Sequence, residues 1–213
     1  YSKWGEESPK HLIGDFAFMI WDEQEQRMFG ARDFSGTRTL YYYHDRERFV
    51  FCTTIKPFFE LPFLEKKLNE QWLAEYLAIP GMHETVEPFS TVYQHVEQLP
   101  PAHTLSIQQG KVSICKYHSM EYGEKLQLHS NEEYEEAFRD VFQKAVTART
   151  RTNRKVGAHL SGGLDSGSVV SFAARALAKD QKQLHTFSYV PLEGFEDWTP
   201  KYRIADERPY IQS

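Results

Sequence analysis

Near its carboxyl end the chain runs through an apolar segment, a loop with two adjacent glycines, an amphipathic stretch and a second apolar segment. The apolar runs at 156–160 and 184–190 predict strands, and apolar residues at helical spacing predict a helix over 167–179. Strand, helix and strand in this order form a βαβ unit, whose two strands lie parallel in one sheet. This pattern constrains the second part of the chain to an α/β fold.

A further helix is predicted just before this unit. Ser130 and Glu133 have the spacing of a capping box, in which each side chain satisfies a backbone donor at the helix start. Apolar residues then recur at helical spacing to about Arg149. The polar stretch 119–129 precedes this helix, so we expect two domains, 1–119 and 120–213.

The first domain is predicted to be rich in β structure. Apolar runs are paired across short polar turns, which predicts three hairpins. Their strands are expected at 16–21 with 27–32, 40–43 with 49–52, and 103–107 with 111–114. One helix is expected over 69–78, ended by Pro80-Gly81. Stacked apolar hairpins of this kind predict a two-layered β structure.

Composition limits the partners and the location. A net charge of -5 and a pI near 6.0 do not favour a nucleic-acid partner, because such proteins carry a basic patch. The sequence has neither an apolar run of membrane-spanning length nor a signal peptide at its start. We therefore expect a cytoplasmic protein without a membrane partner, and the oligomeric state stays open. Because the chain begins at Tyr1 and ends soon after the second strand, we expect a fragment at both ends.

The glycine loop consists of Ser161, Gly162, Gly163, Leu164, Asp165 and Ser166. It follows the first strand of the βαβ unit, where ligands bind in parallel α/β sheets. Adjacent glycines let the backbone approach a bulky ligand, and consecutive amides at a helix N-terminus attract an anion. The hydroxyls of Ser161 and Ser166 can donate to phosphate oxygens. Asp165 would repel a bare phosphate, so its presence predicts a bridging Mg²⁺.

The loop lacks the lysine of a Walker A motif, which argues against transfer of a γ-phosphoryl group. A site for the β- and γ-phosphates would instead hold pyrophosphate as it leaves the α-phosphorus of ATP. The alternative is a structural strand-to-helix turn, in which Asp165 only assists the start of the helix.

In this context SGGLDS resembles the ATP-pyrophosphatase loop, and most of the chain resembles the glutamine-dependent asparagine synthetases and their relatives. Segments 14–22, 31–41 and 98–103 are similar to the GxFAFxxxD, RDxxGxxPLY and LPPGH segments of that family. The resemblance implies an α+β / α/β two-domain architecture. It would hold the later half of an N-terminal-nucleophile glutaminase β-sandwich, followed by the start of an α/β ATP-pyrophosphatase (PP-loop) domain. The glutaminase nucleophile, a cysteine, would lie before Tyr1.

The same resemblance implies where ATP would bind. It would lie against the backbone of His159 and Leu160, along the loop and beside Tyr189, with Ser161 and Asp165 as catalytic residues. Other polar groups are expected to be structural or solvated. They are Arg32-Asp33, expected to form a structural ion pair or to cap the turn at Ser35-Gly36, and Asp206-Glu207-Arg208. The latter segment is similar to an acidic patch that follows the second strand in relatives, but we expect a solvated charge cluster.

The activity implied is that of an ATP-dependent ligase, in which a carboxylate is adenylated with release of pyrophosphate and then amidated. In asparagine synthetases the acid is aspartate and the amine is ammonia from glutamine. Thr39 replaces the proline of RDxxGxxPLY. Similar divergence occurs in lasso peptide cyclases, whose amine belongs to a precursor peptide, so a macrolactam cyclase with a non-catalytic glutaminase-like half is an alternative. A non-catalytic β-rich interaction module is the alternative from another class.

Overall fold

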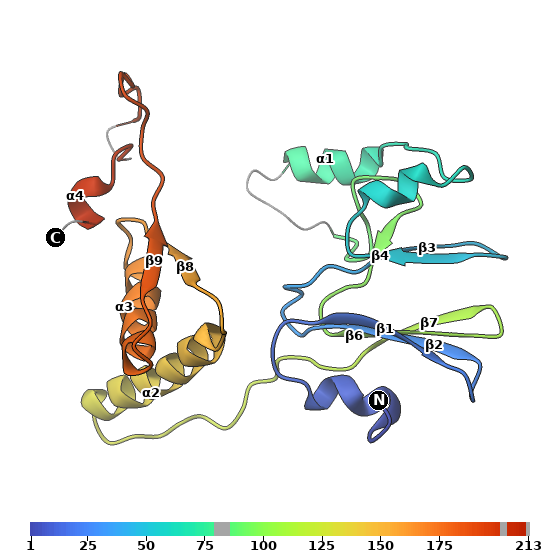
Figure 1. Cartoon of the computed structure of the whole chain (residues 1–213), viewed down its shortest axis with the longest axis horizontal. Helices are drawn as coiled ribbons and strands as arrows, with labels where there is room; N and C mark the ends of the chain where they lie inside the picture. Colours follow the sequence, from blue (N-terminus) through green and yellow to red (C-terminus); the bar gives the residue numbers. More distant parts are fainter. Residues whose placement is uncertain (79–85, 201–203, 212–213) are drawn as a thin grey trace. The chain divides into compact units, whose positions relative to one another are not determined.

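The computed structural model describes residues 1–78, 86–200 and 204–211. The chain divides into two compact units, Tyr1–Gly123 and Glu124–Ser213 (Figure 1). The predicted helix end at Pro80-Gly81 lies outside the described residues. In the described part of the chain, every helix is too short or too polar to cross a membrane.

Unit 1 contains two antiparallel sheets, and the first has four strands in the order β1-β2-β6-β7. The strands are β1 (Ala17–Asp22), β2 (Arg27–Arg32), β6 (His103–Gln108) and β7 (Lys111–Lys116). β1 pairs with β2, and β6 pairs with β7, as adjacent strands of a hairpin. β2 also pairs with β6, far along the chain. The first and third predicted hairpins are confirmed, and they join edge to edge in one sheet.

The second sheet has the order β4-β3-β5. Its strands are β3 (Tyr41–His44), β4 (Phe49–Cys52) and the short β5 (Glu97–Gln98). β3 and β4 confirm the remaining hairpin, whereas β5 was not predicted. The helices of unit 1 are η1 (Gly5–His11), η2 (Lys56–Glu60) and α1 (Glu70–Ala78). Asn69 caps α1, because its Oδ1 accepts a hydrogen bond from the Trp72 amide at 3.2 Å.

The core of unit 1 lies on both sides of β3. Successive side chains of a strand point to opposite faces, so Tyr42 and its neighbours enter different clusters. Tyr42 is buried between the two sheets, in a cluster with Leu40, Leu99 and Leu105. Tyr41 and Tyr43 pack on the other side, against a cluster formed by Phe58, Leu64 and Val96. All three tyrosines therefore serve packing.

The turn after β2 is held by a buried carboxylate. Asp33 is fully buried, and its oxygens accept hydrogen bonds from the amides of Thr37 at 3.0 Å and Arg38 at 2.9 Å. The Ser35 hydroxyl donates to the same carboxylate at 2.9 Å. Burial raises the pKa of Asp33, but the hydrogen bonds outweigh burial and leave the pKa below its usual value. The expected structural role of this residue is confirmed.

Arg32 fastens the same turn to the rest of unit 1. Its guanidinium donates to the carbonyls of Gly36 at 2.7 Å, Arg38 at 2.7 Å and Leu99 at 2.6 Å. Gly36 has a φ of +67°, and a methyl group added there would lie 2.6 Å from Cγ of Pro101. The turn therefore requires glycine at this position for both its backbone angle and its space.

Unit 2 contains the predicted βαβ unit. Its elements are α2 (Asn131–Thr150), β8 (Val156–His159), α3 (Leu164–Lys179), β9 (Leu184–Phe187) and α4 (Arg208–Ile211). β8 and β9 pair in parallel from Val156–Leu184 to His159–Phe187. α3 runs alongside these strands (Figure 1) and contacts α2, where the rings of Phe142 and Phe172 meet edge to face at 5.0 Å.

Element boundaries and one helix cap in unit 2 differ from the prediction. α3 begins at Leu164 instead of 167, because Gly163 is extended (φ -86°, ψ 156°) and forms the N-cap. β9 ends at Phe187 instead of 190. At the start of α2 the Ser130 hydroxyl accepts from the Glu133 amide, but the Glu133 carboxylate accepts from the His129 amide, one residue earlier than a capping box requires.

Candidate functional site

The glycine loop lies between β8 and α3, at the carboxyl ends of the parallel strands (Figure 1). Two serine hydroxyls close the loop on itself. Ser166 Oγ accepts a hydrogen bond from the Ser161 amide at 3.0 Å and lies 2.8 Å from Ser161 Oγ. Ser161 Oγ in turn accepts from the Gly163 amide at 3.3 Å. The loop therefore has a defined shape, although its surface is exposed.

The last three residues of the loop form the first turn of α3. The first amides of a helix have no acceptor within the helix, and the hydrogen bond from Gly167 N–H to Gly163 O marks where regular pairing begins. The amides of Leu164, Asp165 and Ser166 precede that bond. They lie at the positive end of the helix dipole, so this turn can bind an anion.

An acidic side chain from outside the predicted site also reaches the loop. Glu207 Oε2 accepts a hydrogen bond from the Gly162 amide at 3.1 Å. A methyl group added at Gly162 would lie 2.9 Å from Cβ of Tyr210, so this segment packs directly on the glycine. Asp206 and Arg208 form an ion pair at 2.6 Å. The expectation of a solvated cluster at 206–208 is therefore wrong for Glu207.

Sequence patterns could not identify Glu207, because the contact joins residues 45 positions apart. The only available signal was the similarity of this acidic segment to one that follows the second strand in the asparagine synthetase family. That similarity pointed to the segment, but it did not say which carboxylate reaches the loop.

Aromatic side chains lie beside the loop where the two strands end. The His159 and Tyr189 rings stack with their centroids 5.6 Å apart and their planes 9° apart, and Tyr189 is 86% exposed. The backbone N–H and carbonyl of Leu160 both form hydrogen bonds within the protein. Its amide donates to the Phe187 carbonyl at 2.9 Å, and its carbonyl accepts from the Ser188 hydroxyl at 2.7 Å. The exposed surface beside the loop is therefore aromatic.

Asp165 lines a cavity of about 460 Å³ between α2 and α3, together with Arg139, Phe142 and Val169. The rings of His159 and Tyr189 do not line this cavity. Within the described ranges, no three His, Cys, Asp or Glu side chains are grouped so that they could hold a metal ion. A metal ion at Asp165 would therefore take most of its ligands from water and from a bound molecule.

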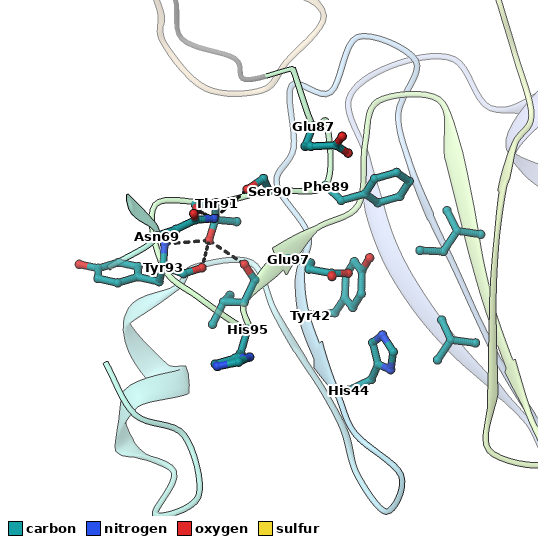
Figure 2. A pocket seen from close by; sticks show the side chains of 13 residues that line it. Tyr42, His44, Asn69, Glu87, Phe89, Ser90, Thr91, Tyr93, His95 and Glu97 are labelled. Atoms are coloured by element: carbon teal, nitrogen blue, oxygen red, sulfur yellow. Dashed lines mark hydrogen bonds between the residues drawn. The ribbon is translucent and has the colours of Figure 1, made fainter. Parts of the chain in front are cut away.

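Unit 1 also contains a cavity of about 620 Å³, lined by residues of β3, β5 and β7 and of the segment before β5 (Figure 2). Several of its polar side chains form hydrogen bonds to other residues of the lining. Asn69 Nδ2 donates to Ser90 Oγ at 3.0 Å, and Thr91 Oγ1 donates to the Val96 carbonyl at 2.6 Å. Burial, together with the hydrogen bond to Glu97, raises the pKa of Tyr42 well above its usual value. These bonds hold the segment before β5 in place, so we assign the cavity to the framework of unit 1.

Comparisons with known proteins match both units. The family model described as a glutamine amidotransferase domain matches residues 1–118, and the model described as asparagine synthase matches residues 137–212. Asparagine synthetase [glutamine-hydrolyzing] 3 of Bacillus subtilis is 32% identical over 88% of this chain and 30% of the relative. A putative asparagine synthetase of Methanocaldococcus jannaschii is 32% identical over 96% of this chain and 39% of the relative. Amidase chry2 of Gibberella zeae is 29% identical over 90% of this chain and 28% of the relative.

The first match covers more than half of the chain and identifies a protein with a glutamine amidotransferase domain. Together with the asparagine synthase match that follows, it shows that the chain belongs to the asparagine synthetase family, as the sequence resemblance predicted. The chain spans 30% and 39% of the lengths of the two asparagine synthetases named above.

Proposed function

We propose that this chain is part of an ATP-dependent amide-bond-forming ligase whose unit 2 binds ATP. A substrate carboxylate attacks the α-phosphorus, an acyl-adenylate forms, and the bond to the β-phosphate breaks to release pyrophosphate. An amine then attacks the acyl carbon, forms the amide bond and releases AMP. Family membership supports aspartate as the acid and glutamine as the source of ammonia.

The observation that carries this proposal is the start of α3 at Leu164. Three amides and the helix dipole meet at this turn, beside the linked hydroxyls of Ser161 and Ser166. One of the two hydroxyls donates to the other, and Ser166 Oγ also lies 3.3 Å from the carbonyls of Ser161 and Gly163, so a phosphate oxygen would replace one of these protein acceptors. Because no lysine is present in the loop, we assign it to holding a departing pyrophosphate by positioning and electrostatic stabilisation.

The remaining predicted residues fit the rest of the nucleotide. The stacked rings of His159 and Tyr189 offer an aromatic face on which an adenine base can stack. Leu160 would contribute apolar contact, since its amide and carbonyl are both hydrogen-bonded to the protein. Asp165 would supply one carboxylate to Mg²⁺, which commonly binds through one or two carboxylates and substrate phosphates. The ion would neutralise charge on the departing pyrophosphate.

The amine substrate could be ammonia or the amino group of a precursor peptide. Thr39 suggested a peptide cyclase, but the structure gives this residue a local role, because its hydroxyl donates to the Thr53 carbonyl at 2.7 Å. That hydrogen bond favours a structural reason for threonine over a change of substrate. We therefore expect aspartate with glutamine or ammonium as the substrates, and a precursor peptide is the competing substrate to be tested.

The test uses the full-length protein with Mg²⁺ and ATP. Aspartate with ammonium or glutamine should release pyrophosphate and AMP in equal amounts and form asparagine, all measured in one reaction. Asp165→Asn should abolish most of this turnover, whereas Asp180→Asn, an exposed change at the other end of α3, should leave it intact. Release of ADP and orthophosphate would contradict adenylation. Turnover only with a peptide would transfer the assignment to a macrolactam cyclase.

A further inference from the structure

The carboxylate of Glu207 lies where a carboxylate is electrostatically unfavourable. It accepts the Gly162 amide at 3.1 Å, in a loop that we propose to hold pyrophosphate. Two like charges at close range repel each other, and the repulsion grows as water is excluded. An acidic side chain beside an anion site therefore requires a compensating role.

The hydrogen bonds of the loop indicate that role. The amides of its first three residues all have protein acceptors, namely Ser166 Oγ, the Glu207 carboxylate and Ser161 Oγ. The amides of the next three residues begin α3, before the first regular helical hydrogen bond. The loop is thus divided into an upstream part fastened to the protein and a downstream part left for a ligand.

Gly162 is the point where this fastening depends on a distant segment. The Glu207 side chain accepts the Gly162 N–H, and this hydrogen bond fixes the plane of the peptide bond before Gly162. Cβ of Tyr210 packs against the same glycine, and the Tyr210 amide donates to the Glu207 carbonyl at 3.0 Å. One turn of chain therefore holds Gly162 by a hydrogen bond and by contact.

We propose that Glu207 is a positioning residue for the pyrophosphate loop. Its carboxylate holds Gly162 so that the amides of Leu164, Asp165 and Ser166 keep the orientation that an anion needs. Glu207 acts through Gly162 and does not contact the nucleotide. This inference rests on the proposed function, because it assumes that pyrophosphate is the ligand of the loop.

The test compares Glu207→Ala with Glu207→Gln in the full-length protein, with Glu193→Ala as a control at an exposed acidic residue of the same unit. Glutamine keeps an oxygen that can accept the Gly162 amide but removes the charge. Two quantities are measured, which are the affinity for Mg²⁺-pyrophosphate by calorimetry and the hydrogen-exchange rate of the loop amides without ligand. Circular dichroism verifies that each variant is folded.

We expect Glu207→Ala to weaken pyrophosphate binding about tenfold, the loss expected when one hydrogen bond is removed. It should also accelerate exchange at Gly162, while Glu207→Gln and Glu193→Ala stay close to the unmodified protein in both measurements.

Three results would overturn the inference. They are unchanged binding and exchange in Glu207→Ala, tighter pyrophosphate binding in that variant, or a Gln variant as impaired as the Ala variant. The first would show that the contact is dispensable, the second that the carboxylate competes with the ligand, and the third that its charge is what matters. If the unmodified protein fails to bind pyrophosphate, the proposed function fails, and the exchange rates still decide whether Glu207 orders the loop.

Discussion

Two turns of this protein combine serine, glycine and aspartate, and they use their backbone amides in opposite ways. In the turn after β2, the amides of Thr37 and Arg38 both bond to Asp33, which is fully buried. In the loop before α3, Asp165 lines the cavity between α2 and α3, and the amides at the helix start have no acceptor within the helix.

The difference shows what separates a structural turn from a binding loop of similar composition. The first turn supplies its own anion, so its amides are satisfied in the folded chain and the turn contributes to stability. The second leaves amides for an anion that comes from solution. Substitutions in the first should therefore change the free energy of unfolding, and substitutions in the second should change ligand affinity.

The largest effect is expected from Asp33→Ala. Removing the buried carboxylate leaves the Thr37 and Arg38 amides without their acceptor, which should lower the free energy of unfolding by about 3 kcal/mol. Asp45→Ala is the matched control, since Asp45 accepts two amides of an exposed turn, both at 2.8 Å. Water can replace that acceptor, so a loss of about 1 kcal/mol is expected in urea unfolding. Equal losses in the two variants would contradict the importance of burial.

Because of Asp33, we also expect the free energy of unfolding to depend on pH. The pKa of Asp33 is lower in the folded protein than its ordinary value of 3.8. Its contribution to stability is therefore fully present above the ordinary value and is lost as the pH falls through the folded pKa. Urea unfolding between about pH 6 and pH 2 should show this loss in the unmodified protein and a smaller one in Asp33→Ala. Identical pH profiles would refute the assignment.

Gly36→Ala should cause the next largest loss in the free energy of unfolding. A side chain there meets Pro101 at 2.6 Å and requires a φ of +67°, so packing and backbone strain add to a loss of about 2 to 3 kcal/mol. Gly110→Ala separates the two causes, because Gly110 has a φ of +74° but no atoms within 4 Å of the added carbon. It should lose only about 1 kcal/mol, the backbone contribution. A similar loss at both positions would show that the contact with Pro101 relaxes.

In the binding loop, Ser166→Ala should act on affinity instead of stability. The change removes the acceptor of the Ser161 amide and the hydroxyl beside Ser161 Oγ. We expect Mg²⁺-pyrophosphate affinity to fall about tenfold, with a thermal midpoint within about 2 °C of the unmodified protein. Ser171→Ala, an exposed change on the same helix, should alter neither. A stability loss as large as that of Gly36→Ala would mean that the loop, too, is mainly structural.

The smallest expected effect is a gain in the free energy of unfolding. Ala102 is buried and has a φ of +59°, a backbone angle that a residue with a side chain rarely adopts. Ala102→Gly should raise the free energy of unfolding by about 0.5 to 1 kcal/mol, since relief of strain exceeds the entropy lost by glycine. Ala31→Gly, within β2, should be destabilising and serves as the opposite control. A loss at Ala102 would show that the side chain's packing outweighs the strain.

Short-range patterns in the sequence were enough to predict much of the fold. The hairpins of unit 1 follow from apolar runs separated by short turns, and β8, α3 and β9 follow from periodicity around the glycine loop. These features depend on residues near one another in sequence, so backbone geometry and side-chain alternation determine them. Family membership also rested on short segments that the sequence shows directly.

Tertiary structure alone decided which distant residues meet. The pairing of β2 with β6 joins separate hairpins into one sheet, and the carboxylate of Glu207 bonds to the amide of Gly162. Tertiary structure also decided that Asp33 accepts the backbone amides of its own turn, whereas Asp165 lines a cavity. The two aspartates are similar in sequence context, because each lies within a few residues of a glycine. Sequence specifies which groups can donate and accept. Burial and long-range contact decide which of them are already paired when a ligand arrives.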